Sequence, residues 1–390
     1  MPLSSSKRIR DITVNGSDGW EVFNKARKMI ASGTHVVELS IGEHDIKTDK
    51  EIINAMNTSA LNGNTGYAEM QGIHKLRELI AKRNQERTGD KTTAENIIIT
   101  PGGQAGLFNA HMATCNEGDK ALFIDPYYAT YPGTIRSVGA RAIPIKTQST
   151  NGFQPTFEEI NNSASGAKSL LINSPNNPTG IIYSKETLNS VADAVLKNNL
   201  WLISDEVYES QIWNGTHISP RSIDAIREQT IVIGSMSKSY AMTGFRCGWI
   251  IGPENIIEDM LNLATSTTYG MSGFIQDAAY FALTKGKAFE EKISTPFLRR
   301  YKLAKNIFQN DKFVKLIPGD GTMYVMLDIR ETGLTGTAFA NNLLDEKKIA
   351  VMPGESFGQA AAGHLRIAMT VSDDIFAQSL IEIKNFAANL

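Results

Sequence analysis

The sequence predicts an α/β protein, with a doubly wound, mostly parallel sheet in a large domain and a smaller α+β domain after it. Six short apolar runs recur between residues 96 and 252, and stretches with helical spacing, such as 105–115 and 185–197, lie between several of them. Buried strands that alternate with helices are typical of a parallel sheet covered on both faces. Ligand sites in such sheets lie at the carboxyl ends of the strands.

The predicted strands of the large sheet are NIIIT (96–100), ALFID (121–125), SLLIN (169–173), LWLIS (200–204), IVIGS (231–235) and GWIIG (248–252). After residue 274 the pattern changes to two long helical stretches, 276–285 and 289–309, followed by a β-like segment at 322–329. This change indicates a second domain that begins near residue 285. No Pro- or Ser-rich linker separates the two parts, so we expect a continuous helix to join them.

Composition and charge argue against several classes of protein. The 390 residues carry 39 Lys and Arg against 41 Asp and Glu, which leaves no basic surplus for nucleic acid or for an anionic membrane. No apolar run approaches the roughly 20 residues that a membrane span needs. The two cysteines, Cys115 and Cys247, have no second Cys or His at ligand spacing, so neither a disulfide framework nor a metal site is indicated. We expect a cytoplasmic protein.

The strongest chemical signal is Lys238 in the segment SMSK (235–238), which follows a predicted strand. A lysine beside serines is ordinarily a solvated loop residue. In a dry pocket, or beside a cation, the pKa of a lysine falls, and the free amine is then a nucleophile that can attack an aldehyde. Arg246 and the hydroxyls of Ser235 and Ser237 could instead hold a phosphate.

A second signal is Asp205, which closes an apolar predicted strand, with Tyr208 three residues later. The simplest interpretation of this carboxylate is a helix N-cap. The alternative is a buried anion against the ring nitrogen of a pyridinium cofactor, because such a ring acts as an electron sink when its nitrogen is held by an anion. In that case Tyr208 could donate a hydrogen bond to the phenolate oxygen of the same ring.

A glycine-rich turn, TPGGQA (100–105), lies between a predicted strand and a helix. The backbone N–H groups of Gly103, Gln104 and Ala105 would form a phosphate cradle there, since a helix N-terminus has unpaired donors and a dipole that favour an anion. The dinucleotide-binding pattern GxGxxG and the nucleotide-binding pattern GxxxxGKS/T are both absent. The turn therefore indicates a phosphate-bearing ligand outside those two classes.

Two further polar side chains follow or interrupt apolar segments. In NSPNNPTG (173–180) the residue before Pro178 is held extended, so the amide of Asn177 can point into a cleft, although Pro and Gly would suit any tight turn. In HLRI (364–367) Arg366 lies between apolar residues. It forms either a buried structural salt bridge or a planar fork of donors for a substrate carboxylate.

Together and in this order, these segments resemble the class I and II aminotransferases, from about Glu38 to Met369. The resemblance implies a fold type I pyridoxal-phosphate transferase, with a seven-stranded sheet in a large domain at 48–285 and a small domain made of 1–47 plus 286–390. It implies transamination of an L-amino acid with a 2-oxo acid by a ping-pong mechanism, with pyridoxal 5′-phosphate as cofactor. A pyridoxal-phosphate C–S or β-lyase is the alternative, because the residues around the cofactor are nearly the same in both.

By this resemblance Lys238 holds the cofactor as a Schiff base and then shuttles a proton between the substrate Cα and the cofactor. Asp205 pairs with the pyridine nitrogen, and Asn177 and Tyr208 contact the ring oxygen. Tyr128 would stack on the ring. The residues that would bind the cofactor phosphate are Gly103, Gln104, Ala105, Ser235, Ser237 and Arg246.

The same resemblance implies where the substrate and a second subunit bind. Gly42, Asn177 and Arg366 would face the substrate and its carboxylate. Tyr67 would reach the cofactor phosphate of the neighbouring subunit. We therefore expect a homodimer with shared active sites, whose small-molecule partners are an amino acid and a 2-oxo acid.

The choice of substrates stays open between arginine or another amino acid with pyruvate, and aspartate with 2-oxoglutarate. Aspartate aminotransferases that this chain resembles bind the distal carboxylate with a cation. In one group it is a phosphate-loop lysine, whose position is Gln104 here, and in the other it is a partner-subunit arginine shortly before segment 274–276, yet this chain has no Lys or Arg between Arg246 and Lys285. The segments at 269–279 and 321–334 are most similar to arginine–pyruvate transaminases, which would use pyruvate as acceptor. A cationic donor would need a carboxylate at the pocket mouth, and Glu43 or Asp45 could serve.

Overall fold

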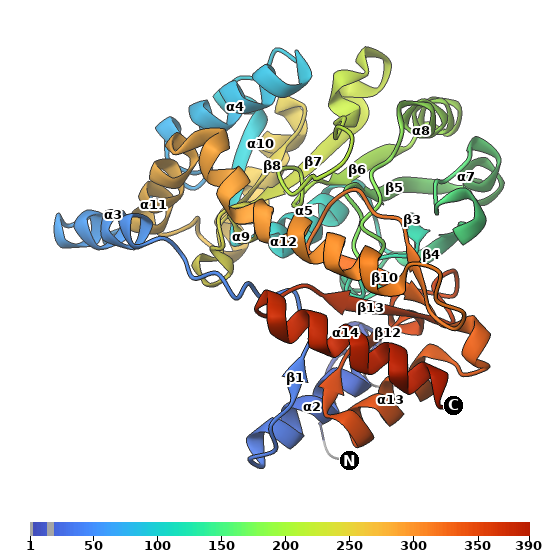
Figure 1. Cartoon of the computed structure of the whole chain (residues 1–390). Coiled ribbons are helices and arrows are strands. Elements are labelled where there is room, and N and C mark those ends of the chain that lie inside the picture. The colour runs from blue at the N-terminus through green and yellow to red at the C-terminus, as the bar shows by residue number, and fades with distance from the viewer. Residues whose placement is uncertain (1–2, 14–18) are drawn as a thin grey trace.

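Seven strands form the large sheet of the computed structural model, which describes residues 3–13 and 19–390 (Figure 1). Their spatial order is β2 (Ile97–Thr100), β8 (Gly248–Ile251), β7 (Thr230–Ser235), β6 (Trp201–Asp205), β5 (Ala167–Asn173), β3 (Lys120–Asp125) and β4 (Arg141–Lys146). Neighbouring strands are parallel, except that β8 runs antiparallel to β2 and β7. The predicted α/β class with a mostly parallel sheet is confirmed.

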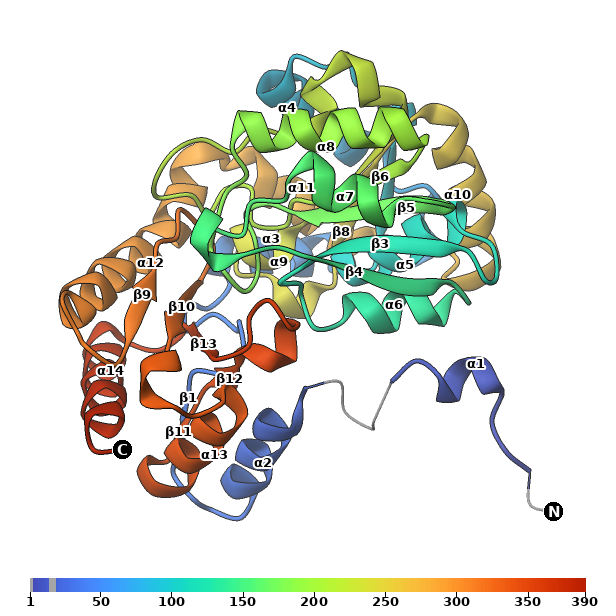
Figure 2. The same ribbon diagram turned by 90° about the vertical axis from the view of Figure 1, so that its right-hand side faces the viewer.

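Helices cover both faces of this sheet (Figure 2). One face packs against α5 (Gly103–Thr114), α6 (Tyr131–Ser137) and α10 (Glu254–Thr267). The other packs against α4 (His74–Thr88), α7 (Phe157–Ser163), α8 (Lys185–Asn198) and α11 (Gly273–Thr284). Ile231 and Ile233 of β7 belong to the first core and Val232 to the second, because successive side chains of a strand face opposite ways.

One strand of the large sheet, β4, was not among the six strands predicted from the sequence. It is the edge strand of the large sheet, most of its residues are exposed or half-buried, and it contains Pro144. Proline is tolerated in an edge strand, where one side of the backbone has no ladder partner. The expected pattern of a buried strand is therefore missing from β4.

The C-terminal third forms a second, antiparallel sheet with the order β12 (Met352–Pro353), β13 (His364–Ala368), β10 (Tyr324–Asp328) and β9 (Lys315–Ile317). The predicted β-like segment at 322–329 contains β10. Beside this sheet, β1 (Val37–Glu38) pairs in parallel with β11 (Ile349–Ala350). The helices packed around these strands are α2 (Glu21–Ala31), α13 (Gly336–Lys347) and α14 (Asp373–Ala388).

The long helix α12 (Gly286–Phe308) connects the two parts of the molecule (Figure 1). Its first half places Phe289 and Ile293 in a core shared with the large sheet. Its second half places Phe297 and Phe308 in the core around the second sheet. Because α12 begins directly after residue 285, we keep the proposed division into domains at this point.

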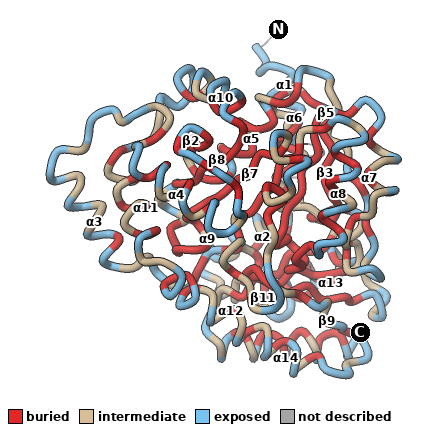
Figure 3. The backbone as a smooth tube through the Cα atoms, turned by 90° about the horizontal axis from the view of Figure 1, so that it is seen from above, coloured by how far each residue is buried: buried red, intermediate tan, exposed pale blue. Residues whose placement is uncertain are grey.

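Two of the remaining helices, α1 (Lys7–Arg10) and α3 (Lys50–Leu61), lie at the periphery, and the short, buried α9 (Met236–Ser239) lies beside the site. Buried backbone follows the strands, whereas α3 projects from the body with Ile52 as its one buried residue (Figure 3). Within the described residues, no helix is both long and apolar enough to cross a membrane.

Candidate active site

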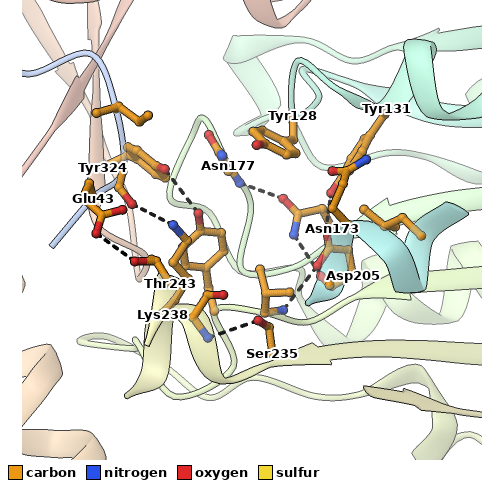
Figure 4. A pocket seen from close by; sticks show the side chains of 18 of the residues that line it. Glu43, Tyr128, Tyr131, Asn173, Asn177, Asp205, Ser235, Lys238, Thr243 and Tyr324 are labelled. Atoms are coloured by element: carbon orange, nitrogen blue, oxygen red, sulfur yellow. Dashed lines mark hydrogen bonds between the residues drawn. The ribbon is translucent and has the colours of Figure 1, made fainter. Parts of the chain in front are cut away.

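The last residues of β5, β6 and β7 are Asn173, Asp205 and Ser235, and all three line one cavity of about 250 Å³ (Figure 4). They meet because the carboxyl ends of parallel strands lie at the same edge of a sheet. Tyr324 from β10 and Arg366 from β13 line the opposite wall. The site therefore lies between the large sheet and the second sheet.

Lys238 enters the cavity from the short helix α9. This helix is held by Ser235, whose hydroxyl accepts a hydrogen bond of 3.1 Å from the backbone N–H of Ser237. The Lys238 Nζ donates to the carbonyl oxygen of Gly42 at 2.7 Å, and the Lys238 carbonyl accepts from Gln211 Nε2 at 3.0 Å. Lys238 is half-buried and fixed at both ends, so it is not a freely solvated loop residue.

Asp205 is a buried carboxylate at the floor of the cavity. It accepts hydrogen bonds from the Tyr131 hydroxyl at 2.6 Å and from the Val207 backbone N–H at 3.3 Å. Burial raises the pKa of Asp205 from 3.8 to about 6, because the charged form loses its hydration. A turn follows Asp205 instead of a helix, so the helix-cap alternative is wrong. A buried carboxylate of this kind suits a cationic ligand.

Tyr208 and Tyr324 form a pair of phenols over the same cavity. The Tyr208 hydroxyl donates to the Tyr324 hydroxyl at 3.3 Å. Burial raises the pKa of Tyr208 well above its ordinary value, so the phenol keeps its proton and can donate it in a hydrogen bond.

Arg366 is a buried cation, and no described acidic residue forms an ion pair with it. Its Nη1 donates to Asn177 Oδ1 at 3.0 Å and its Nη2 donates to the Ser40 carbonyl, but its Nε has no partner. The guanidinium carbon lies 4.3 Å from the ring centre of Tyr324 and 4.4 Å from that of Phe357. The structural salt-bridge alternative is therefore wrong, and the unused donor and charge suit an anionic ligand.

The glycine-rich turn forms a cradle at the N-terminus of α5. Gly102 is the N-cap of α5, with a φ of 81°. The first backbone N–H groups of a helix have no partner within the helix, so they are available to a ligand. The guanidinium of Arg246 lies so close to this turn that a Cβ at Gly102 would be 2.3 Å from Arg246 Nη2. Positive charge, orphan N–H groups and the hydroxyls of Ser235 and Ser237 together suit a phosphate.

The family model described as Aminotransferase class I and II matches residues 34–378. The chain belongs to this family. An arginine–pyruvate transaminase of Pseudomonas aeruginosa is 35% identical over 97% of this chain and 97% of that protein. An aspartate/prephenate aminotransferase of Thermus thermophilus is 32% identical over 91% of this chain and 92% of that protein. The protein is thus an aminotransferase, and it catalyses transamination.

Solved structures agree with this assignment. The aspartate aminotransferase of Thermus thermophilus with maleate has a TM-score of 0.92 and 30% sequence identity, and it covers 99% of this chain and 100% of its own. An aspartate aminotransferase from Thermotoga maritima gives the same TM-score, identity and coverage. The resemblance that the motifs indicated is confirmed over nearly the whole fold.

The aminotransferase brings most of the predicted site residues to one cavity, which is lined by Gly42, Gly103, Gln104, Tyr128, Asn177, Asp205, Tyr208, Ser235, Ser237, Lys238, Arg246 and Arg366. Two predicted residues lie elsewhere. Ala105 lines the neighbouring cavity, one residue further along α5. Tyr67 is 88% exposed and packs edge to face against Tyr269, with ring centres 4.9 Å apart.

Several residues that line the cavity of this aminotransferase were not predicted from the sequence. Tyr131 contacts Asp205, and Tyr324 contacts both Tyr208 and Arg366. Trp20 lines the cavity from the N-terminal segment, just before α2. Tyr128 precedes α6, so helical spacing did not link it to Tyr131, and Tyr324 and Trp20 likewise had no signal in the sequence.

Gly42 allows the second sheet to approach the cavity. A Cβ at this position would lie 1.9 Å from the Tyr324 hydroxyl oxygen. We expect Gly42→Ala to displace Tyr324 and the stacked Arg366, and to lower kcat/KM roughly 10²-fold, the effect of a small misplacement of binding groups. Gly244→Ala adds a methyl group with no atom within 4 Å and should keep wild-type kcat/KM. Equal kcat/KM in both variants would contradict the expectation that displacing Tyr324 and Arg366 lowers activity.

Proposed function

We propose that this aminotransferase binds pyridoxal 5′-phosphate in the cavity, with Lys238 as the amine that holds it, and exchanges the amino group of an L-amino acid with a 2-oxo acid. The observation that carries the proposal is the order of groups around one cavity. A lysine amine, a buried carboxylate, an anion cradle and a buried arginine all line this cavity. When bound, the cofactor supplies an aldehyde for the amino group and a ring that withdraws electrons from the substrate Cα.

The donor set fits this cofactor group by group. The N-terminus of α5, the two serine hydroxyls and Arg246 match a phosphate dianion. The carboxylate of Asp205, held by Tyr131, matches a protonated ring nitrogen. The phenol of Tyr208 and the amide of Asn177 match a ring oxygen. Tyr128, in the loop before α6, offers an aromatic face on which the cofactor ring could stack.

Arg366 binds the substrate α-carboxylate in this proposal, because it is the buried cation with a donor still unused. Asn177 fixes the guanidinium through its Oδ1, and the rings of Tyr324 and Phe357 fix its plane. Lys238 lines the same cavity as Arg366, so an amino acid bound by Arg366 would have its Cα within that cavity. Lys238 is then placed to take the Cα proton as a base and to return it as an acid.

An absorbance experiment tests the proposal. Purified protein with pyridoxal phosphate is titrated with single amino acids, and a visible band that converts to the amine form of the cofactor with certain donors is the expected result. A 2-oxo acid should then restore the original band. If no band forms with added cofactor, the proposal is wrong. Release of ammonia and pyruvate without an acceptor would instead establish the lyase reaction.

We further propose a homodimer in which Tyr67 completes the phosphate site of the partner subunit. This phenol is 88% exposed and lies away from the cavity of its own chain. Tyr67→Phe keeps the ring contact with Tyr269 and removes the hydroxyl. We expect it to weaken cofactor binding roughly 10- to 100-fold, the effect of one hydrogen bond to a charged group.

Mixed dimers distinguish contact across the interface from contact within one chain. A Tyr67→Phe chain paired with a Lys238→Ala chain has one site that combines an intact Lys238 with an intact Tyr67 from the partner. Half of the sites in this heterodimer should bind the cofactor as tightly as wild type, measured by equilibrium dialysis. If Tyr67 acted within its own chain, none of the sites would do so.

The relatives leave the amino donor open. One is named as an arginine–pyruvate transaminase and others as aspartate or aspartate/prephenate aminotransferases, so a cationic and an acidic side chain are both represented among them. The proposed function therefore covers any L-amino acid donor.

A further inference from the structure

We propose that the cavity selects amino donors with a cationic side chain, a guanidinium or an ammonium, and that Glu43 is the carboxylate that binds it. The inference rests on the proposed function, because the same cavity holds the reacting amino group. Three features of the cavity carry it. A carboxylate without an ion pair lines the cavity, the described lining residues include no cation without another role, and an indole ring also lines the cavity.

Glu43 is the unpaired carboxylate. It follows Gly42, lines the cavity, and accepts a hydrogen bond of 2.7 Å from the Thr243 hydroxyl (Figure 4). Among the residues that the structure describes, no Lys, Arg or His forms an ion pair with it. The Thr243 hydroxyl donates to Oε1 of Glu43, so Oε2 remains for a ligand.

Asp45, the other acidic residue of this loop, is already paired. Arg300 binds it through Nη1 at 3.0 Å and Nη2 at 2.6 Å, and the same guanidinium donates to Asp373 at 2.9 Å. Arg300 is 4% exposed, so this pair belongs to the core between α12 and α14. Asp45 anchors the loop and leaves Glu43 as the acidic residue that a ligand can reach.

The cations of the cavity are committed to other groups in the proposed function. Arg366 serves the substrate carboxylate, Arg246 serves the phosphate, and Lys238 holds the cofactor. At the α5 turn the residue is Gln104, whose Nε2 donates to Thr134 at 2.7 Å and whose Oε1 accepts from Thr130 at 2.9 Å. With no cation left over among the described lining residues, a second carboxylate on the substrate would meet only Glu43 and neutral groups, which disfavours it.

Trp20 is an aromatic residue in the lining of the same cavity. It lines the cavity together with Glu43 and is half-buried against Phe23, with ring centres 5.5 Å apart. An indole ring attracts a guanidinium or ammonium over its face, and a planar guanidinium can at the same time bind a carboxylate in its plane. A carboxylate and an indole that line the same cavity favour a cationic side chain over a neutral one.

The test compares L-arginine with L-citrulline, which has the same shape and length but a neutral end group. In half-reactions of the holoenzyme, followed by cofactor absorbance, we expect Glu43→Gln to lower kcat/KM for arginine about ten-fold, as for one charge-assisted hydrogen bond, and to change that for citrulline less than about two-fold. Glu346→Gln, on the exposed face of α13, removes the same charge away from the cavity and should change neither.

Binding without turnover gives a second readout. The carboxylic acids 5-guanidinopentanoate and 5-ureidopentanoate lack the reacting amine, and calorimetry with the holoenzyme measures their Kd. We expect the guanidino acid to bind more tightly to wild type, and Glu43→Gln to remove most of that difference. A difference that persists in Glu43→Gln, or an equal loss for both acids, would mean that Glu43 shapes the loop and does not bind the cation.

The outcomes separate this inference from the proposed function. If wild type converts the cofactor with citrulline or alanine but shows no preference for arginine, or prefers aspartate, the selection by Glu43 is overturned and the transamination chemistry stands. If no amino acid converts the cofactor, the assignment of the cavity itself fails. Preference for arginine that falls in Glu43→Gln supports both.

Discussion

Lys238→Ala is expected to abolish the covalent attachment of pyridoxal phosphate and to lower turnover roughly 10⁴-fold, the upper range for loss of a positioned acid–base group. The structure gives the reason, since Lys238 Nζ already lies in the cavity, 2.7 Å from the Gly42 carbonyl oxygen. The measurement is borohydride reduction of the holoenzyme followed by peptide mass spectrometry. The adduct should lie on the peptide that contains Lys238, and the variant should yield none.

A matched control is Lys287→Ala, in which an exposed lysine of α12 is removed. It should keep both the adduct and the turnover of wild type. An adduct on another lysine, or a Lys238→Ala variant that still turns over within ten-fold of wild type, would contradict the assignment. The variant also leaves Arg366 and the α5 cradle intact, so it should still bind the cofactor noncovalently.

The elements that bear the site could be predicted because their signal is local. Asp205 and Ser235 each end an apolar run, and the end of a buried strand is where a parallel sheet places its ligands. The turn at Gly102 could be predicted because its signal is also local: the strand, the glycine and the helix follow one another in the sequence. In β4 the local signal was absent, because an edge strand buries little of its surface.

Residues whose role depends on distant contacts could not be assigned in this way. Glu43 and Asp45 are two residues apart and chemically alike, and they differ because Arg300, 255 positions after Asp45, pairs with one of them. Tyr324 gains its place from the packing of β10 against β13 and from the missing side chain at Gly42. Such roles follow from tertiary packing, which no periodicity of the chain records.

The second large expected effect concerns Asp205. Its buried site disfavours the charged carboxylate as long as no cation is bound beside it. In the cofactor-free protein its pKa is about 6 against an ordinary 3.8, so the folded state holds the proton more tightly than the unfolded state. This contribution to the free energy of unfolding is present below about pH 4 and is lost as the pH rises through about 6. The shift corresponds to roughly 3 kcal/mol.

Asp205→Asn removes that charge while an amide oxygen can still accept from the Tyr131 hydroxyl. At pH 8 the cofactor-free variant should therefore be more stable than wild type, by up to about 3 kcal/mol, and the difference should shrink toward zero near pH 4. Urea unfolding at both pH values measures it. Asp125, whose pKa burial also raises to about 6, is present in both proteins and cancels in the comparison.

Addition of pyridoxal phosphate should reverse the order of stability. A protonated ring nitrogen gains from the Asp205 carboxylate and little from an amide, so the cofactor should stabilise wild type more than Asp205→Asn, and turnover of the variant should fall roughly 10³-fold. If the cofactor stabilised both proteins equally, Asp205 would not face the ring nitrogen. Without the cofactor, burial disfavours the charged form of Asp205. The same burial would favour a cationic ring beside it, because a charge pair is stronger where water is excluded.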